Sequence, residues 1–196
     1  MKTFRAFGPT IGKSKLSKKI IQNINEYVDG ITISKRNDYS SKLASQIKNE
    51  IKLSSIFIKK NISKELIKNI RDYLLKSDIK KIKEIKIINV WVVKQLKNEY
   101  NPVHYHEGQL SGVGYLKIPK NMNQNKLVKN KRIMTNGTID FINGQKNFLS
   151  KSIYNINPKL GDLVIFPNYL MHTAYPFNID GERRSFSFNV KISFKK

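Results

Sequence analysis

The three histidines of the chain, His104, His106 and His172, are its clearest candidates for chemistry. His104 and His106 are separated by one residue in a predicted strand, 103–107, where side chains at positions i and i+2 point to the same face. His172 follows the apolar run 163–166 and the turn residue Pro167, which places it at the end of a second strand. Three imidazoles on one face can hold a metal and leave positions open for substrate and dioxygen, as a catalytic iron requires. The sequence has no cysteine, so any metal must be held by nitrogen and oxygen ligands.

A second candidate lies eleven positions past His172, where Arg183 opens an alternating strand. Period-two alternation puts Arg183 and Ser185 on one polar face, and Arg184 on the other face together with two phenylalanines. An arginine and a hydroxyl on an inner face would form a clamp for a carboxylate. Arg184 is then expected to extend to solvent at the start of the strand. The alternative is a half-solvated edge strand with a surface arginine.

The elements that position these residues belong to a chain of ordinary globular composition. At 196 residues, with 39% apolar residues, it fits a single domain with its own core. No apolar run reaches the roughly 18 residues of a membrane helix. The first residues show no secretory signal. We therefore expect a cytoplasmic protein with no membrane association.

The charge of the chain is strongly unbalanced, with 37 Lys and Arg against 14 Asp and Glu, a formal net charge of +23. Such a balance favours nucleic acid, acidic protein or anionic metabolites as partners. A codon bias toward lysine, asparagine and isoleucine is the alternative, but it does not explain the shortage of acids. The loop 120–131 and Arg132 carry five basic residues and no acid. We expect this loop to help bind a macromolecular or anionic substrate over the mouth of the site. The oligomeric state stays open.

The first 84 residues are predicted to be mostly helical. After a strand candidate at 3–7, Ser17 is a plausible N-cap of a helix that Asp29 and Gly30 end. Further helices are predicted at 41–50, with Leu43, Ala44 and Ile47 inward, and at 63–76. These apolar stripes are interpreted as core.

From about residue 85 the pattern changes to short strands. A β-branched run at 85–93 is typical of a strand buried on both faces. Shorter strands are predicted at 111–118, 131–135, 138–142, 162–166 and 183–192. Asn136-Gly137 predicts a type I′ hairpin turn. Many short strands separated by turns favour a sandwich or barrel.

Five segments together resemble a known family: Asn101 to His106, Leu110 to Leu116, Gly161 to Pro167, His172, and Arg183 to Asn189. They are similar to the 2-oxoglutarate/Fe(II) oxygenases of marine bacteria and phages, within the prolyl-hydroxylase-like superfamily, over about residues 85 to 192. The resemblance implies an α+β fold with a mainly β core, a double-stranded β-helix (jelly roll, cupin-like) at 85–196. Helices in 1–84 would support it within one domain, 1–196. It also implies that Arg183 and Ser185 match the Arg-x-Ser element that binds the distal carboxylate of 2-oxoglutarate.

One position departs from the family pattern. The wider superfamily has His-x-Asp/Glu followed by a distal histidine, and here His106 stands in the place of the carboxylate. Glu107 should face the other side of the strand unless a bulge turns it inward. We therefore favour a metal site of His104, His106 and His172.

The resemblance implies a dioxygenase that uses Fe(II), 2-oxoglutarate and dioxygen, most simply as a hydroxylase. Peptidyl proline, another side chain, a free amino acid and a nucleobase all stay open as substrates. Two other functions remain alternatives. One is a three-histidine iron dioxygenase without 2-oxoglutarate, in which Arg183 binds a carboxylate of the substrate. The other is a non-catalytic jelly-roll module that binds nucleic acid.

Overall fold

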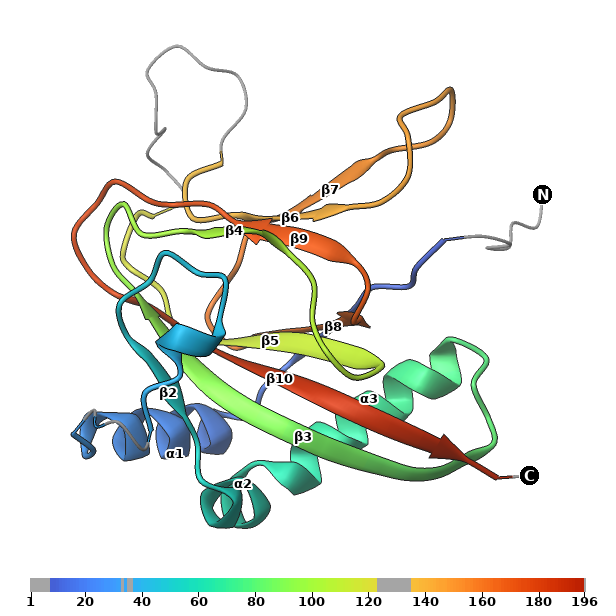
Figure 1. Cartoon of the computed structure of the whole chain (residues 1–196), viewed down its shortest axis with the longest axis horizontal. Coiled ribbons are helices and arrows are strands. Elements are labelled where there is room, and N and C mark those ends of the chain that lie inside the picture. The colour runs from blue at the N-terminus through green and yellow to red at the C-terminus, as the bar shows by residue number, and fades with distance from the viewer. Residues whose placement is uncertain (1–7, 33, 35–36, 123–134, 196) are drawn as a thin grey trace.

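The computed structural model describes residues 8–32, 34, 37–122 and 135–195. Two antiparallel sheets face each other, and three helices cover the outer side of the larger sheet (Figure 1). The predicted strands at 3–7 and 131–135 lie outside the described residues, as does most of the basic loop 120–131. None of the described helices is long and apolar enough to cross a membrane.

The larger sheet has six strands, in the order β1 (Gly12–Lys15), β8 (Asp162–Pro167), β5 (Leu110–Lys117), β10 (Arg183–Phe194), β3 (Ile82–Gln95) and β2 (Glu50–Lys52). The smaller sheet has the order β4 (Asn101–His104), β9 (Met171–Ala174), β6 (Ile139–Ile142) and β7 (Ile153–Ile156). The expected mainly β jelly roll with N-terminal helices is confirmed. Because β1 and β2 come from the first 84 residues, this part of the chain completes the sheet as well as supporting it.

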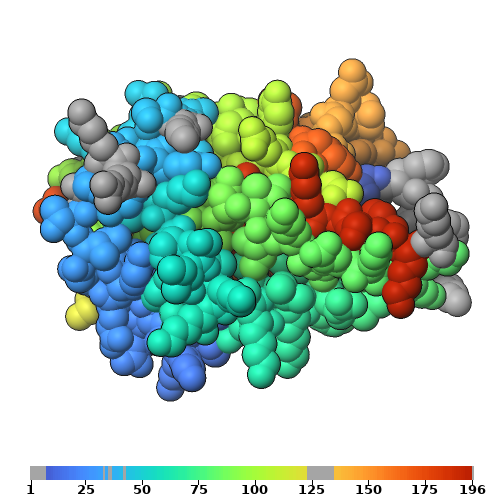
Figure 2. All heavy atoms as spheres, turned by 60° about the horizontal axis from the view of Figure 1, so that its bottom comes forward, coloured from blue at the N-terminus to red at the C-terminus, as the bar shows by residue number. Residues whose placement is uncertain are grey.

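The helices α1 (Lys18–Asp29), α2 (Ser55–Asn61) and α3 (Ser63–Lys76) form a layer against the larger sheet (Figures 1 and 2). Ser17 caps α1, since its hydroxyl accepts a hydrogen bond from the Ile20 amide at 3.3 Å. The predicted stripe of α1 is buried in the main core together with Phe186 and Phe188 of β10. The bounds of α1 and α3 agree with the sequence prediction, whereas α2 was not predicted.

The predicted helix at 41–50 is wrong. This segment forms one short 3-10 turn, Ser40–Lys42, and then runs along the edge of the larger sheet. Its backbone groups bond to the sheet edge and a nearby loop, with the Tyr39 amide donating to Glu50 at 2.8 Å and the Gln46 amide donating to Tyr100 at 2.9 Å. Ile47 is buried against Trp91, so the apolar spacing reflects contact with a sheet and no helical stripe.

The turn at Asn136-Gly137 also differs from its prediction. A type I′ turn needs positive φ at both central residues. Here Gly137 has φ of +67° and Asn136 is not in the left-handed region. The Asn136 side chain is buried and donates to the Met122 carbonyl at 2.7 Å. This tertiary contact holds Asn136 in a backbone conformation that a type I′ turn does not allow.

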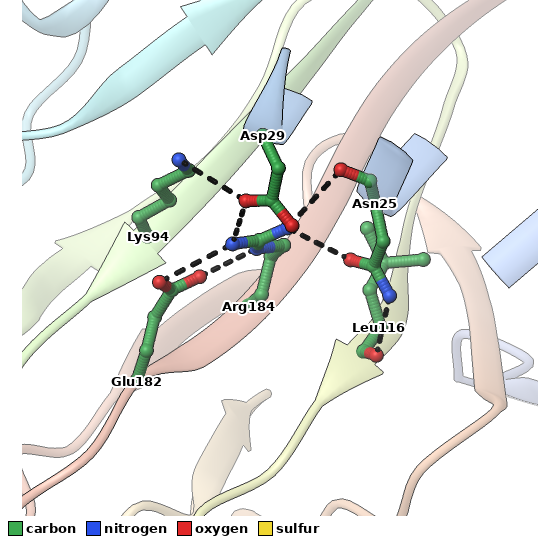
Figure 3. A network of polar contacts seen from close by, with 6 residues as sticks. All are labelled: Asn25, Asp29, Lys94, Leu116, Glu182 and Arg184. Carbon is green, nitrogen blue, oxygen red and sulfur yellow. Dashed lines mark hydrogen bonds and ion pairs between the residues drawn. The ribbon is translucent and has the colours of Figure 1, made fainter. Parts of the chain in front are cut away.

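Arg184 is buried as well, which corrects the expectation that it reaches solvent. Its guanidinium donates to Glu182, to Asp29 at 2.7 Å and to the Asn25 side chain at 3.1 Å (Figure 3). Asn25 in turn donates to the Leu116 carbonyl at 3.2 Å. The network therefore ties the end of α1 to the start of β10, at the residue beside Arg183.

Two glycines of β5 make room for the two phenylalanines of β10. Gly112 pairs with Phe188 and Gly114 pairs with Phe186. A Cβ atom at Gly112 would lie 2.3 Å from the Phe188 ring and 2.7 Å from the Val164 carbonyl oxygen. The rings therefore lie flat over bare backbone, as aromatic residues do opposite strand glycines.

We expect Gly112→Ala to lower the free energy of unfolding by about 1–3 kcal/mol, because neither the ring nor the backbone carbonyl can withdraw in a packed core. Urea denaturation measures this change. Gly30→Ala is the matched control, since Gly30 has ordinary φ and its added Cβ would meet the carbonyl oxygens of Glu26 and Tyr27 no closer than 3.3 Å. Equal losses in both variants would contradict the packing argument.

The segment 37–49 is held to the sheet in part by Glu50, whose side chain is 1% exposed. Oε2 accepts a hydrogen bond from the Ser45 hydroxyl, while Oε1 finds no partner among the residues that the structure describes. Burial first, and then the nearby carboxylates of Asp38 and Glu99, raise the pKa of Glu50 to about 7. A buried carboxyl without a basic partner favours its neutral form.

This raised pKa predicts that the protein loses stability as the pH rises. Between the ordinary glutamate pKa of 4.5 and about 7 the folded state binds the proton more tightly than the unfolded state does. The protein therefore loses stability over this pH range, and the loss is complete above about pH 7. The stability of Glu50→Gln relative to the unmodified protein should rise by about 3 kcal/mol from pH 4 to pH 8. Urea denaturation across this range measures it. A difference that does not change with pH would refute it.

Candidate metal centre and cavity

Two neighbouring strands of the smaller sheet bring His104 and His172 together, because they are directly paired in the β4–β9 ladder. β4 ends at His104, so the prediction that His106 lies within the same strand is wrong. His106 is held instead by Asn168, which accepts from the His106 amide and donates back to its carbonyl, both at 3.0 Å. This pair of hydrogen bonds directs His106 to the same side as the other two histidines.

The three histidines form one compact group. One ring nitrogen of each lies within 4.8 Å of the others, and Nε2 of His106 is 3.1 Å from Nε2 of His172. Nδ1 of His104 is 2.7 Å from the Pro102 carbonyl oxygen, and Nδ1 of His172 is 2.9 Å from that of Leu170. Because a carbonyl only accepts, Nδ1 of both rings carries the proton and Nε2 keeps its lone pair for a metal. The donor set and its spacing therefore fit a metal ion.

The electrostatics of the group keep the imidazoles neutral. Burial lowers the pKa of all three histidines, to about 3 for His106, where the charge of His104 adds to the effect. Metals bind the neutral imidazole, so the environment selects the ligating form. Glu107, the alternative ligand, is exposed and does not belong to the group.

Aromatic rings surround the histidines. Phe166 packs edge-on against His172 with ring centroids 4.8 Å apart, and Phe141 stacks on the same ring at 5.7 Å. Trp91 lies 5.7 Å from the His106 ring. These contacts restrict the rotation of the imidazoles and keep water away from their inner side.

The group opens into a cavity of about 400 Å³ between the two sheets. The inward face of β10 lines it, as alternation predicted: Arg183, Ser185, Ser187 and Asn189. Segment 37–49 contributes another wall through Tyr39, Leu43 and Ile47. Among the described lining residues only Arg183 and Glu107 carry charge.

Arg183 is 4% exposed, and its partners within the described part of the chain are all neutral. Its guanidinium donates to the Gly137 carbonyl at 2.6 Å and to Oε1 of Gln95, while Nε has no partner. No carboxylate of the described residues forms an ion pair with it. Burial lowers the pKa of Arg183, as expected for a cation without an anion. A carboxylate guest would supply the missing charge.

Sequence reasoning missed three residues that shape this site. Gln95 bonds Arg183 and is itself held by the carbonyls of Glu99 and Tyr175. Tyr115 is paired with Ser185 across β5 and β10 and lines the same end of the cavity. Burial raises the pKa of the Tyr115 phenol, which stays a donor. Asn168 holds His106. For Gln95 the available signal was its period-two spacing from Trp91.

Solved structures share this fold. A viral collagen prolyl hydroxylase of Paramecium bursaria Chlorella virus-1, in complex with 2-oxoglutarate, is 16% identical, with TM-score 0.58 over 94% of this chain and 96% of that one. A Pseudomonas putida prolyl-4-hydroxylase is 11% identical, with TM-score 0.54 over 95% and 93%. HygX of Streptomyces hygroscopicus, with nickel and 2-oxoglutarate bound, is 10% identical, with TM-score 0.57 over 95% and 83%. At these identities the likeness shows the fold alone.

A search of curated proteins finds no significant match. The family described as "Putative 2OG-Fe(II) oxygenase" matches residues 89–189, which include the three histidines, Arg183 and Ser185. This match spans more than half of the chain and agrees with the metal-binding geometry. The chain therefore belongs to the 2OG-Fe(II) oxygenase family, and it is an oxygenase whose cofactors are iron(II) and 2-oxoglutarate.

Proposed function

We propose that the protein is a hydroxylase in which His104, His106 and His172 hold iron(II), and Arg183 with Ser185 binds the distal carboxylate of 2-oxoglutarate. The observation that carries this assignment is the buried Arg183, which lacks a carboxylate partner and faces the same cavity as the three histidines. One dicarboxylic acid can then engage the arginine at one end and the metal at the other.

In this arrangement the bound iron supplies the activation of dioxygen, coupled to the oxidative decarboxylation of 2-oxoglutarate. The chain supplies position and surroundings. Arg183 offers a charged donor to the far carboxylate, and Gln95 fixes the plane of its guanidinium. The hydroxyls of Ser185 and Tyr115, neighbours across two strands, add neutral donors. The aromatic rings around the histidines exclude water from the reacting end of the cavity.

The substrate is proposed to be macromolecular. Val103 and Tyr105 flank the histidines and are 47% and 70% exposed, which leaves apolar surface beside the mouth for a large partner. The net charge of +23 favours an anionic one, with the basic loop 120–131 as a contact. Peptidyl proline, another side chain and a nucleobase in single-stranded nucleic acid are the candidates. Residues 1–196 would act as one domain.

Metal binding can be followed through Trp91, the single tryptophan of the chain, because it lies against His106. We expect Co(II) to quench its fluorescence in a saturable way. His172→Ala should weaken Co(II) binding by more than about 10-fold, because loss of a residue that only supports a ligand already lowers metal affinity by about that much. His106→Asp should keep the site, because a carboxylate is also a ligand for this class of metal.

Tyr105→Ala is the control, since it changes an exposed neighbour of two ligands. Saturable quenching that survives His172→Ala unchanged would refute the ligand assignment. Protein that binds no metal at all would support the non-catalytic module instead.

The role of Arg183 is tested by comparing it with its neighbour. Arg183→Ala should raise the KM for 2-oxoglutarate by about 100-fold, the loss of a buried charged hydrogen-bonded contact of about 3 kcal/mol. Arg184→Ala should lower stability and leave this KM nearly unchanged, because Arg184 faces α1. The rate of succinate formation measures the KM of both variants.

Variants of Gln95 separate the effect of an added negative charge beside Arg183 from the effect of a lost hydrogen bond. Gln95→Glu places a carboxylate against Arg183, so it should compete with 2-oxoglutarate and raise the KM in the same way. Gln95→Met is its control, because it removes the hydrogen bond without adding charge. Equal effects of Arg183→Ala and Arg184→Ala would reverse the assignment. Substrate oxidation without 2-oxoglutarate would favour the dioxygenase that needs no co-substrate.

A further inference from the structure

A second cavity, of about 350 Å³, lies at the other side of the sandwich, between β1 and the hairpin of β6 and β7. Its inner wall is apolar and includes Phe141, Ile156 and Leu170, all buried. Its rim is polar and includes Lys13, Lys151 and the side chains of Asn143 and Ser152. Figure 1 shows this hairpin projecting from the smaller sheet, on the side where the N-terminal strand enters.

The two cavities share one wall. A buried apolar cluster that includes Phe141 and Phe166 fills the space between the sheets. Phe166 lines the first cavity and Phe141 lines the second. The Phe141 ring also stacks on His172. A ligand that shifts Phe141 would therefore change the packing of a proposed metal ligand.

The rim of the second cavity is positively charged. Lys13 and Lys15 both pair with Asp162, at 3.0 and 2.6 Å, so one carboxylate faces two ammonium groups. Lys151 is exposed and forms no ion pair within the described part of the chain. The lining contains no acid, and the sequence has none from 141 to 161. An anionic group at the rim would find unbalanced positive charge.

The hairpin that lines this cavity also carries exposed apolar side chains. At the apex of the hairpin Phe148 and Leu149 are each 93% exposed, and Leu149 is held at φ of +65°. Exposed apolar side chains in a turn of unfavourable geometry are typical of a binding element.

We infer that this second cavity binds an amphipathic organic acid, with its apolar tail against Phe141 and its carboxylate at Lys151 and Lys13, and that Phe141 transmits its presence to His172. A short dicarboxylic acid such as 2-oxoglutarate is excluded here, because the apolar wall would face its second charge. The ligand is an effector that differs from the co-substrate in having one charged end and one apolar end.

Decanoate is a suitable probe, measured by calorimetric titration of the full chain in the presence of saturating 2-oxoglutarate. We expect one decanoate site that 2-oxoglutarate does not displace. Lys151→Glu should weaken binding by at least about 10-fold, because it turns an attraction at the rim into a repulsion. Ser152→Phe should do the same by filling the cavity.

Lys146→Glu is the matched control, since it makes the same charge change on the same hairpin outside the cavity lining. Decanol tests the need for charge and should bind at least about 10-fold more weakly. The inference is overturned if decanoate does not bind, if 2-oxoglutarate displaces it, or if Lys146→Glu weakens it as much as Lys151→Glu.

The coupling to His172 has its own readout. In Co(II)-loaded protein, decanoate should shift the visible absorption of the metal, and Phe141→Leu should remove this shift while decanoate still binds. Binding without any shift in the unmodified protein would overturn the coupling. Because the binding titration needs no metal, its result is independent of whether the proposed metal site is correct.

Discussion

The burial of one guanidinium, that of Arg183, constrains the rest of this structure. Arg183 sits between the two sheets, where a carbonyl and an amide oxygen are its only hydrogen-bond partners among the described residues. A buried charge without a counter-ion opposes folding, so the surrounding structure must hold it firmly. It does so through the register of β10, which places Arg183 inward and Arg184 outward. A slip of one residue would exchange the two arginines and reverse both faces of the strand.

The strand β5 and the helix α1 both protect this register. On the outer face Phe186 and Phe188 lie over Gly114 and Gly112 of β5, where an added Cβ atom would come within 2.3 Å of each ring. Arg184 adds a polar anchor to α1 (Figure 3). The helices therefore affect the cavity although no residue of them lines it. The helices contact the outer face of β10, and this contact determines which side chains of β10 line the cavity on its inner face.

The sequence predicts the features that follow from local periodicity. Strand alternation placed Arg183 and Ser185 on the face that lines the cavity, and capping chemistry placed the start of α1 at Ser17. The failures share a different cause. Residues 41–50 have helical spacing, but their backbone bonds to the sheet edge, and His106 lies beyond its strand because Asn168 binds it. Hydrogen bonds between distant segments decide these cases, and periodicity carries no information about them.

The three-histidine set changes the charge of the cavity. If the three histidines hold iron(II), the neutral imidazoles would leave the metal with two positive charges and Arg183 would add a third, whereas a carboxylate in place of His106 would leave two in total. A doubly charged 2-oxoglutarate would thus leave one positive charge uncompensated. Glu107 is the one acid among the described residues that line the cavity, and it is exposed at the mouth. Its carboxylate would therefore offset the remaining positive charge, an offset that a site with a carboxylate in place of His106 would not need.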